Sequence, residues 1–193
     1  KSNFLRFITA NTNFRELCSD IEDTHFVYVD LSAALETTPV EVIKMIFFDI
    51  LSDFSEKGLI DGYTDKDIAE IWEIDHLQVL FKRFRDFLGE LEDLGEIRVI
   101  LDNYETILES EFIEEIGELL ASLRNRTGGY LQYIIAVSSL RLFEESQDKI
   151  GEQFSRIFNQ NIFYFPLTSN IEQHTKRADY KIKDIDELEK VIK

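Results

Sequence analysis

Asp102, Asn103 and Glu105 directly follow the apolar run Ile97–Leu101, and their types suit chemistry on a phosphate. An apolar run that ends in Asp is typical of a buried strand that presents a carboxylate at its carboxyl end. Such a carboxylate can hold the hydration shell of a Mg2+ ion, and a carboxylate or amide behind it can position an attacking water. The same pattern also fits an Asp that caps a helix or closes a turn.

Two further places carry candidate residues. Ser138 follows the apolar run Leu131–Val137, where a hydroxyl can reach a γ-phosphate or its attacking water; a helix N-cap is the equally good alternative. Arg156 precedes a fourth apolar run, Ile162–Leu167. From there an arginine can cross a subunit interface and stabilise charge on a neighbour's phosphate, although surface arginines are common.

Lys1 and Ser2 stand directly before a segment whose apolar residues, among them Phe4 and Ile8, have helical spacing. Lys-Ser followed by a helix matches the last two letters of the phosphate-binding P-loop, G-x-x-x-x-G-K-[ST]. We expect Lys1 to meet the β- and γ-phosphates and Ser2 to ligate Mg2+. We also expect a strand and a glycine loop before Lys1, because the glycines would supply the backbone N–H groups that cradle the phosphates.

The elements that must position these residues alternate along the chain. Four apolar runs predict buried strands, at Phe26–Leu31, Ile97–Leu101, Leu131–Val137 and Ile162–Leu167. Helical patterns separate them: one begins with Thr38, Pro39 and Glu41 as a capping box, and a long one over 64–95 has room for two helices. A third covers 111–124 and ends near a glycine pair. The alternation predicts an α/β fold with a parallel sheet and helices on both faces.

Composition limits the classes of partner. The net charge of −17, from 38 acidic and 21 basic residues, repels phosphate backbones and so disfavours nucleic acid as a partner. The one cysteine, Cys18, excludes an internal disulfide and favours a reducing, cytoplasmic compartment. No apolar run approaches the roughly 18 residues of a membrane span. His25, His76 and His174 are scattered, which disfavours a metal-dependent hydrolase.

Together, the order and spacing of these segments resemble the nucleotide-binding domain of AAA+ and STAND-type P-loop ATPases, in particular the origin-recognition-like and archaeal-ATPase branch. "KSNFLRFI" is similar to the end of Walker A, "VILDNYE" to Walker B and "IIAVSS" to the sensor-1 strand. "SRIFNQNIFYFPLT" is similar to the arginine-finger strand and its exit. The resemblance implies a three-layer P-loop core over 1–167, the start of a helical lid over 168–193, ATP and Mg2+ as cofactors, and assembly with copies of itself or other protein partners.

Two positions depart from that family's pattern. The family usually places an acidic residue directly after the Walker B Asp, and this chain has Asn103, which can orient a water but cannot accept its proton. Ser138 stands where Asn or Thr is common. We therefore expect slow hydrolysis, unless Glu105 substitutes as the base. Both departures favour a nucleotide-gated switch over a rapid motor. The alternative is a degenerate P-loop domain that serves as a protein-interaction scaffold.

Overall fold

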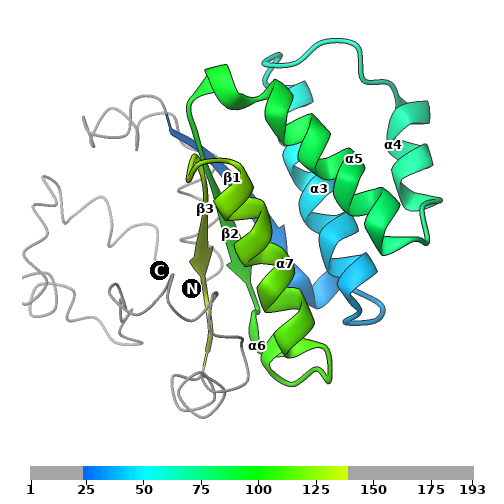
Figure 1. The fold of residues 1–193 in the computed structure, drawn as a ribbon, viewed down its shortest axis with the longest axis vertical. Helices are drawn as coiled ribbons and strands as arrows, with labels where there is room; N and C mark the ends of the chain where they lie inside the picture. Colours follow the sequence, from blue (N-terminus) through cyan, green and yellow to red (C-terminus); the bar gives the residue numbers. More distant parts are fainter. Residues whose placement is uncertain (1–23, 139–193) are drawn as a thin grey trace, which may run out of the picture. The chain divides into compact units, whose positions relative to one another are not determined.

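The computed structural model describes residues 24–138, which belong to one compact unit. Its centre is a parallel three-stranded sheet in the order β1-β2-β3 (Figure 1). The strands are β1 (Thr24–Asp30), β2 (Glu96–Asp102) and β3 (Leu131–Ile135), with Asp30 opposite Asp102 in the register. The three predicted strands in this range and their parallel pairing are therefore confirmed. The fourth, Ile162–Leu167, and the boundary between core and lid at 167 lie outside the described residues.

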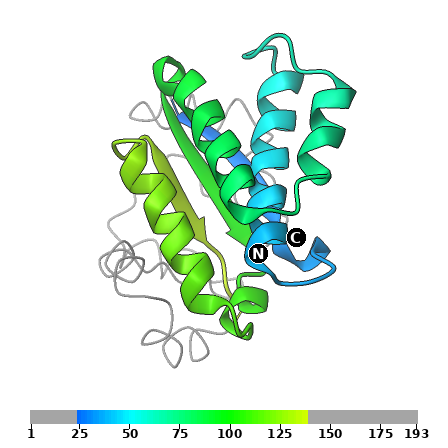
Figure 2. The same ribbon diagram turned by 45° about the vertical axis from the view of Figure 1, so that its right-hand side comes forward.

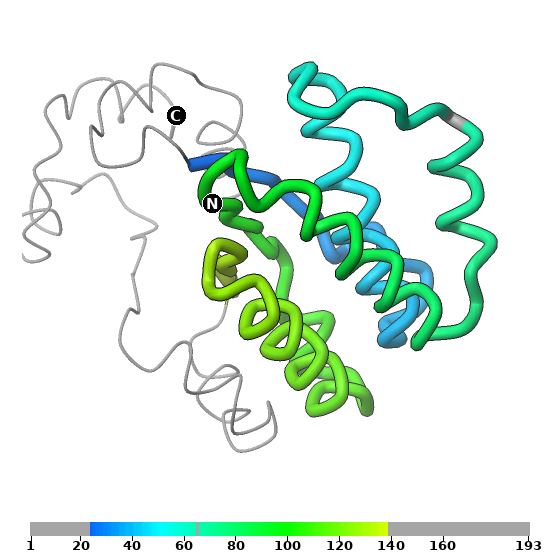
Figure 3. Tube along the Cα trace, turned by 45° about the horizontal axis from the view of Figure 1, so that its top comes forward, coloured from blue at the N-terminus to red at the C-terminus, as the bar shows by residue number. Residues whose placement is uncertain are grey.

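The long helices gather on one face of the sheet. Figures 1 and 2 show α3 (Pro39–Glu56), α5 (Leu77–Glu90) and α7 (Ile113–Arg126) on the same side. This follows from the topology, because both strand-to-strand crossovers step in the same direction and crossovers share one hand. α4 (Asp65–Trp72) packs against α3, and the tube in Figure 3 shows it beyond the other helices. The fold is thus mixed α/β, and a helical layer on the second face is not part of 24–138.

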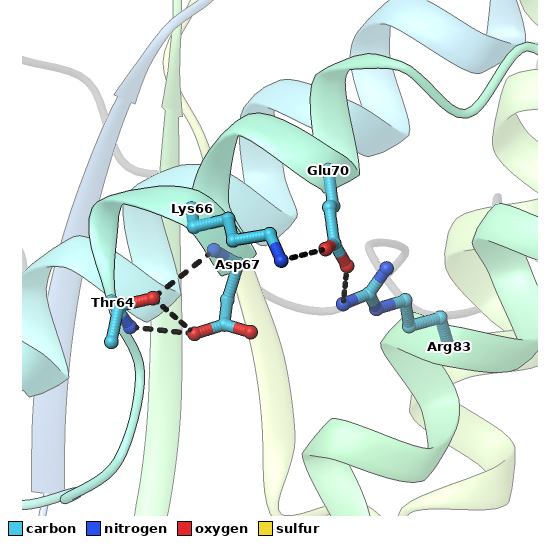
Figure 4. Close-up of polar contacts among 5 residues, drawn as sticks. All are labelled: Thr64, Lys66, Asp67, Glu70 and Arg83. Carbon is cyan, nitrogen blue, oxygen red and sulfur yellow. Dashed lines mark hydrogen bonds and ion pairs between the residues drawn. The ribbon is translucent and has the colours of Figure 1, made fainter.

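Local signals in the sequence explain where α3 and α4 begin. Thr38 is the N-cap of α3, its hydroxyl accepts the Glu41 N–H at 3.3 Å, and Pro39 is the first helical residue. Thr64 and Asp67 form a reciprocal capping box at the start of α4, drawn in Figure 4. These side chains satisfy N–H groups that have no partner within the helix. The predicted helical stretch over 64–95 is therefore two helices, α4 and α5.

The core lies between the sheet and the helical layer. Phe47 of α3 stacks on Phe84 of α5 with ring centroids 4.8 Å apart, and both are almost wholly buried. Buried aromatic pairs of this kind contribute strongly to stability through area and geometry. Lys44 is also buried: it donates from Nζ to the Trp72 carbonyl oxygen at 2.8 Å and lies 3.5 Å from Asp75. Lys44 therefore ties the end of α4 to α3.

The chain reverses after α7 through Gly128 and Gly129, whose φ angles are +64° and +96°. Only glycine adopts this region at little cost, so the predicted helix end is confirmed. Short segments complete the unit: 3-10 helices at Leu31–Ala33 and Glu92–Leu94, and α6 (Glu105–Leu108) directly after β2. Within the described stretch, no helix combines the length and apolarity needed to cross a membrane.

Candidate functional site

The candidate site is the edge of the sheet where the strands reach their carboxyl ends. In parallel sheets that bind ligands, the binding crevice lies at this edge, since successive loops meet there. Asp30 ends β1, Asp102 ends β2, and Ser138 lies three residues after β3. We refer to Tyr28, Asp30, Asp102, Asn103, Glu105 and Ser138 as the carboxyl-edge network.

Asp102 is the buried centre of this network. Its exposed fraction is 0%. The Tyr28 hydroxyl donates to Oδ2 at 2.8 Å, and the Asn103 N–H donates to Oδ1 at 2.9 Å. Burying a carboxylate is costly unless donors compensate for its lost hydration, and these two bonds supply part of that compensation. They also fix the direction of both oxygens.

The side chain of Asn103 binds the end of β1, whereas its backbone N–H binds Asp102. Its φ of +56° is the left-handed conformation that Asn tolerates better than most residues. Its side-chain amide donates to Asp30 Oδ1 at 2.8 Å, and Ser32 donates to the same oxygen from its N–H at 3.1 Å and its hydroxyl at 2.6 Å. Asn103 therefore links the loops after β1 and β2.

Opposing effects act on the pKa of Asp30. Partial burial and, to a smaller extent, the nearby charge of Asp102 raise this pKa. The hydrogen bonds from Ser32 and Asn103 lower it, and together they outweigh the two raising effects. The result is a pKa below the usual range of a carboxyl group. Asp30 is thus an anion at neutral pH, and the Asn103 amide is held as its donor.

Glu105 is bound to the end of β3. Its Oε1 accepts the Ser138 N–H at 2.9 Å and also the Ser138 hydroxyl. Backbone bonds bring these loops together, because the Tyr104 N–H donates to the Ala136 carbonyl at 3.2 Å and the Ala136 N–H to Leu101 at 2.9 Å. The two candidates that follow β2 and β3 therefore meet.

Asp49 of α3 is a second carboxyl group influenced by this edge. Burial raises its pKa to about 7, with smaller contributions from the negative charges of Asp30 and Asp53. No residue within 24–138 donates a hydrogen bond to it. Burial therefore destabilises the charged form of Asp49, whereas at Asp102 hydrogen-bond donors offset this cost.

A shallow groove lies beside the network, between the start of α3 and the segment joining α6 to α7. Its lining includes three glutamates and four hydroxyl side chains: Glu36, Thr37, Thr38, Thr106, Glu109, Ser110, Glu111 and Phe112. The glutamates make this groove unfavourable for phosphate groups. A nucleotide at this edge would have to lie outside it.

The donors at the edge fit Mg2+ in kind. Mg2+ prefers oxygen ligands and is usually held by one or two carboxylates together with waters and substrate phosphates. Asp102 and Asp30 supply such oxygens from adjacent strand ends. Over 24–138, no cluster of three or more His, Cys, Asp or Glu side chains forms a complete metal cage. The edge therefore offers carboxylate oxygens of the right kind but, within these residues, no complete set of protein ligands.

Asp102, Asn103 and Glu105 are neighbours in the sequence, and the structure brings Ser138 to Glu105, as expected from the ends of parallel strands. Lys1, Ser2 and Arg156 lie outside the described residues, so their expected roles stay predictions. Sequence reasoning missed Tyr28 and Asp30. Asp30 had a signal, since it lies near the end of a predicted strand just as Asp102 does, but the contact made by Tyr28 depends on strand register.

Comparison with known proteins adds no relative: no protein-family model, no curated protein and no solved structure matches this chain.

Proposed function

We propose that this chain is an ATP- and Mg2+-binding domain of the AAA+/STAND type that acts as a slow nucleotide-gated switch. One observation carries the proposal: Asp102, Asn103, Glu105 and Ser138 converge at the carboxyl edge of a parallel sheet, in the order that the resemblance requires. Asp102, Asn103 and Glu105 are sequence neighbours, so the supporting contact is the one between Glu105 and Ser138, which links the ends of two adjacent strands.

The roles of the side chains in this proposal are those that the resemblance implies. Asp102, with its oxygens oriented by Tyr28 and Asn103, would hold Mg2+ together with Ser2, and Lys1 would meet the phosphates. Bound Mg2+ supplies charge neutralisation on the phosphate oxygens. Arg156 would act on a neighbouring copy in a homo-oligomer, and the lid would begin at 168. We place this switch in the cytoplasm because its only cysteine is Cys18.

Slow turnover follows from how the polar groups are engaged. Asn103 has no basic atom, and its amide is held by Asp30 at 2.8 Å. Glu105 can accept a proton, but Ser138 holds one of its oxygens with two hydrogen bonds. Glu105 can act on an attacking water only if its carboxylate is directed at that water, and a change in its bonds to Ser138 is what a switch would control.

The direct test is ATP binding by the full-length protein with and without Mg2+. We expect Mg2+-dependent binding that Asp102→Ala weakens by tenfold or more, since it removes a carboxylate from the ion shell. Asp86→Ala, which removes an exposed carboxylate paired with Arg85, is the matched control and should bind like the wild type. Wild-type protein without measurable nucleotide binding would contradict the proposal.

The scaffold alternative has one observation in its favour. Each polar side chain of the network is bonded to another member, in the pairs Tyr28–Asp102, Asn103–Asp30 and Ser138–Glu105. In the scaffold alternative, these bonds join the loops and bind no ligand. In that case Asp102→Ala would lower the melting temperature while nucleotide had no effect on the melting of the wild type.

A further inference from the structure

We propose that Tyr28 is a positioning residue that orients Asp102 toward the metal–nucleotide ligand. This inference rests on the proposed function and assigns a role to a strand residue that would not itself contact the ion or the nucleotide. Tyr28 lies on β1, whereas Asp102 ends β2, 74 residues later. The hydroxyl of Tyr28 donates to Oδ2 of Asp102 at 2.8 Å.

The strand register explains how Tyr28 reaches Asp102. Tyr28 is opposite Ile100, and Asp30 is opposite Asp102. Side chains two residues apart on a strand point to the same face of the sheet, so Tyr28 and Asp102 share a face and lie diagonally across two adjacent strands. A tyrosine is long enough to span this diagonal and place its hydroxyl on the carboxylate.

Two donors to Asp102 from the described part of the chain, Asn103 and Tyr28, differ in what a substitution can change. The Asn103 N–H belongs to the backbone and holds Oδ1 whatever side chain residue 103 carries. Tyr28 holds the other oxygen through a single hydroxyl that a substitution can remove. A carboxylate has about four acceptor sites, so two bonds can fix its orientation without using its full capacity as an acceptor.

Groups that orient a metal ligand typically change metal affinity by about 10–100-fold when they are removed. Tyr28→Phe deletes only the hydroxyl oxygen and keeps the ring. We therefore expect the Mg2+ concentration needed for half-maximal ATP binding by the full-length protein to rise by about tenfold. ATP binding in excess EDTA should stay at the wild-type level, a difference that a merely structural role would not produce.

Tyr130→Phe is the matched control. It also removes a half-buried tyrosine hydroxyl, one that donates to the Leu88 carbonyl at 2.6 Å just before β3, at the opposite edge of the sheet. Its Mg2+ titration should match that of the wild type. Circular dichroism and thermal melting of both variants would show whether either one has lost its fold.

A double-mutant cycle keeps the inference testable if Tyr28→Phe is also destabilised. If Tyr28 acts through Asp102, Tyr28→Phe should have no further effect on the Mg2+ titration in an Asp102→Asn background. Equal effects in both backgrounds would overturn the inference, as would a single variant with the wild-type titration. A wild type that binds no nucleotide would overturn the proposed function as well, so the two failures are distinguishable.

Discussion

The carboxyl-edge network and the outer contacts between α4 and α5 use similar residue types in different surroundings. At the edge, Asp102 is wholly buried, and its bonds join segments far apart in the chain. On the outer surface, Glu70 of α4 lies 3.4 Å from Arg83 of α5 and 3.9 Å from Lys66 of α4, with side chains 38–85% exposed (Figure 4). Water competes for the outer pairs but not for Asp102, so we expect substitutions at the edge to have much larger effects.

The largest expected effect is on the rate of hydrolysis. Wild-type turnover should lie below roughly 1 s⁻¹, because Asn103 cannot accept a proton from the attacking water. Asn103→Glu should raise the rate, by up to about 10²–10⁴-fold, with little change in ATP affinity. Steady-state hydrolysis by the full-length protein measures this. Fast wild-type turnover that Glu105→Gln abolishes would show that Glu105 is the base and that the switch is not slow.

Stability provides the next contrast, at Asn103. Asn103→Ala removes the bond to Asp30 and places alanine at a φ of +56°, so we expect a loss of about 2–4 kcal/mol in unfolding free energy. Asn103→Gly removes the same bond without strain and should lose less. Urea denaturation of both variants separates the two contributions. Equal losses would mean that the backbone conformation contributes nothing at this position.

A smaller effect concerns the pH dependence of stability through Asp49. Its pKa is about 7 in the folded protein and 3.8 as an ordinary Asp, so the folded state holds more protons between these values. Stability should therefore fall as pH rises from about 4 to about 7, and the loss should be complete above that range.

Asp49→Asn removes this titration. The variant should match the wild type near pH 4 and exceed it in unfolding free energy by about 1–2 kcal/mol at pH 8, after allowance for partial exposure. Denaturation at several pH values measures the difference. Asp86→Asn, at an exposed ion pair, is the control and should leave the pH profile unchanged. Parallel profiles for wild type and Asp49→Asn would disprove the assignment.

The smallest effect should come from the outer ion pair. A double-mutant cycle with Glu70→Ala and Arg83→Ala should give a coupling free energy of about 0.2–0.5 kcal/mol, and salt should weaken it. A coupling above about 1 kcal/mol would remove the contrast between the exposed contacts and the buried network.

Much of the described fold was predictable because its signals are local. The apolar runs at β1, β2 and β3 show burial directly, and Thr38 with Pro39 announces the start of α3. The candidate residues after β2 and β3 were found because polar residues that follow buried strands lie at one edge. The helices expected on the second face and the fourth strand stay predictions, as do the roles of Lys1, Ser2 and Arg156.

What the sequence by itself determined is the order of the elements, their approximate ends and the residue types at the carboxyl edge, because periodicity and capping act over a few residues. Only the tertiary structure decided the partners. The Asn103 side-chain amide binds Asp30, Tyr28 reaches Asp102, and Glu105 binds Ser138, across 73, 74 and 33 residues respectively. Those pairs depend on strand register and on the left-handed turn at Asn103, which the packing of the whole sheet selects.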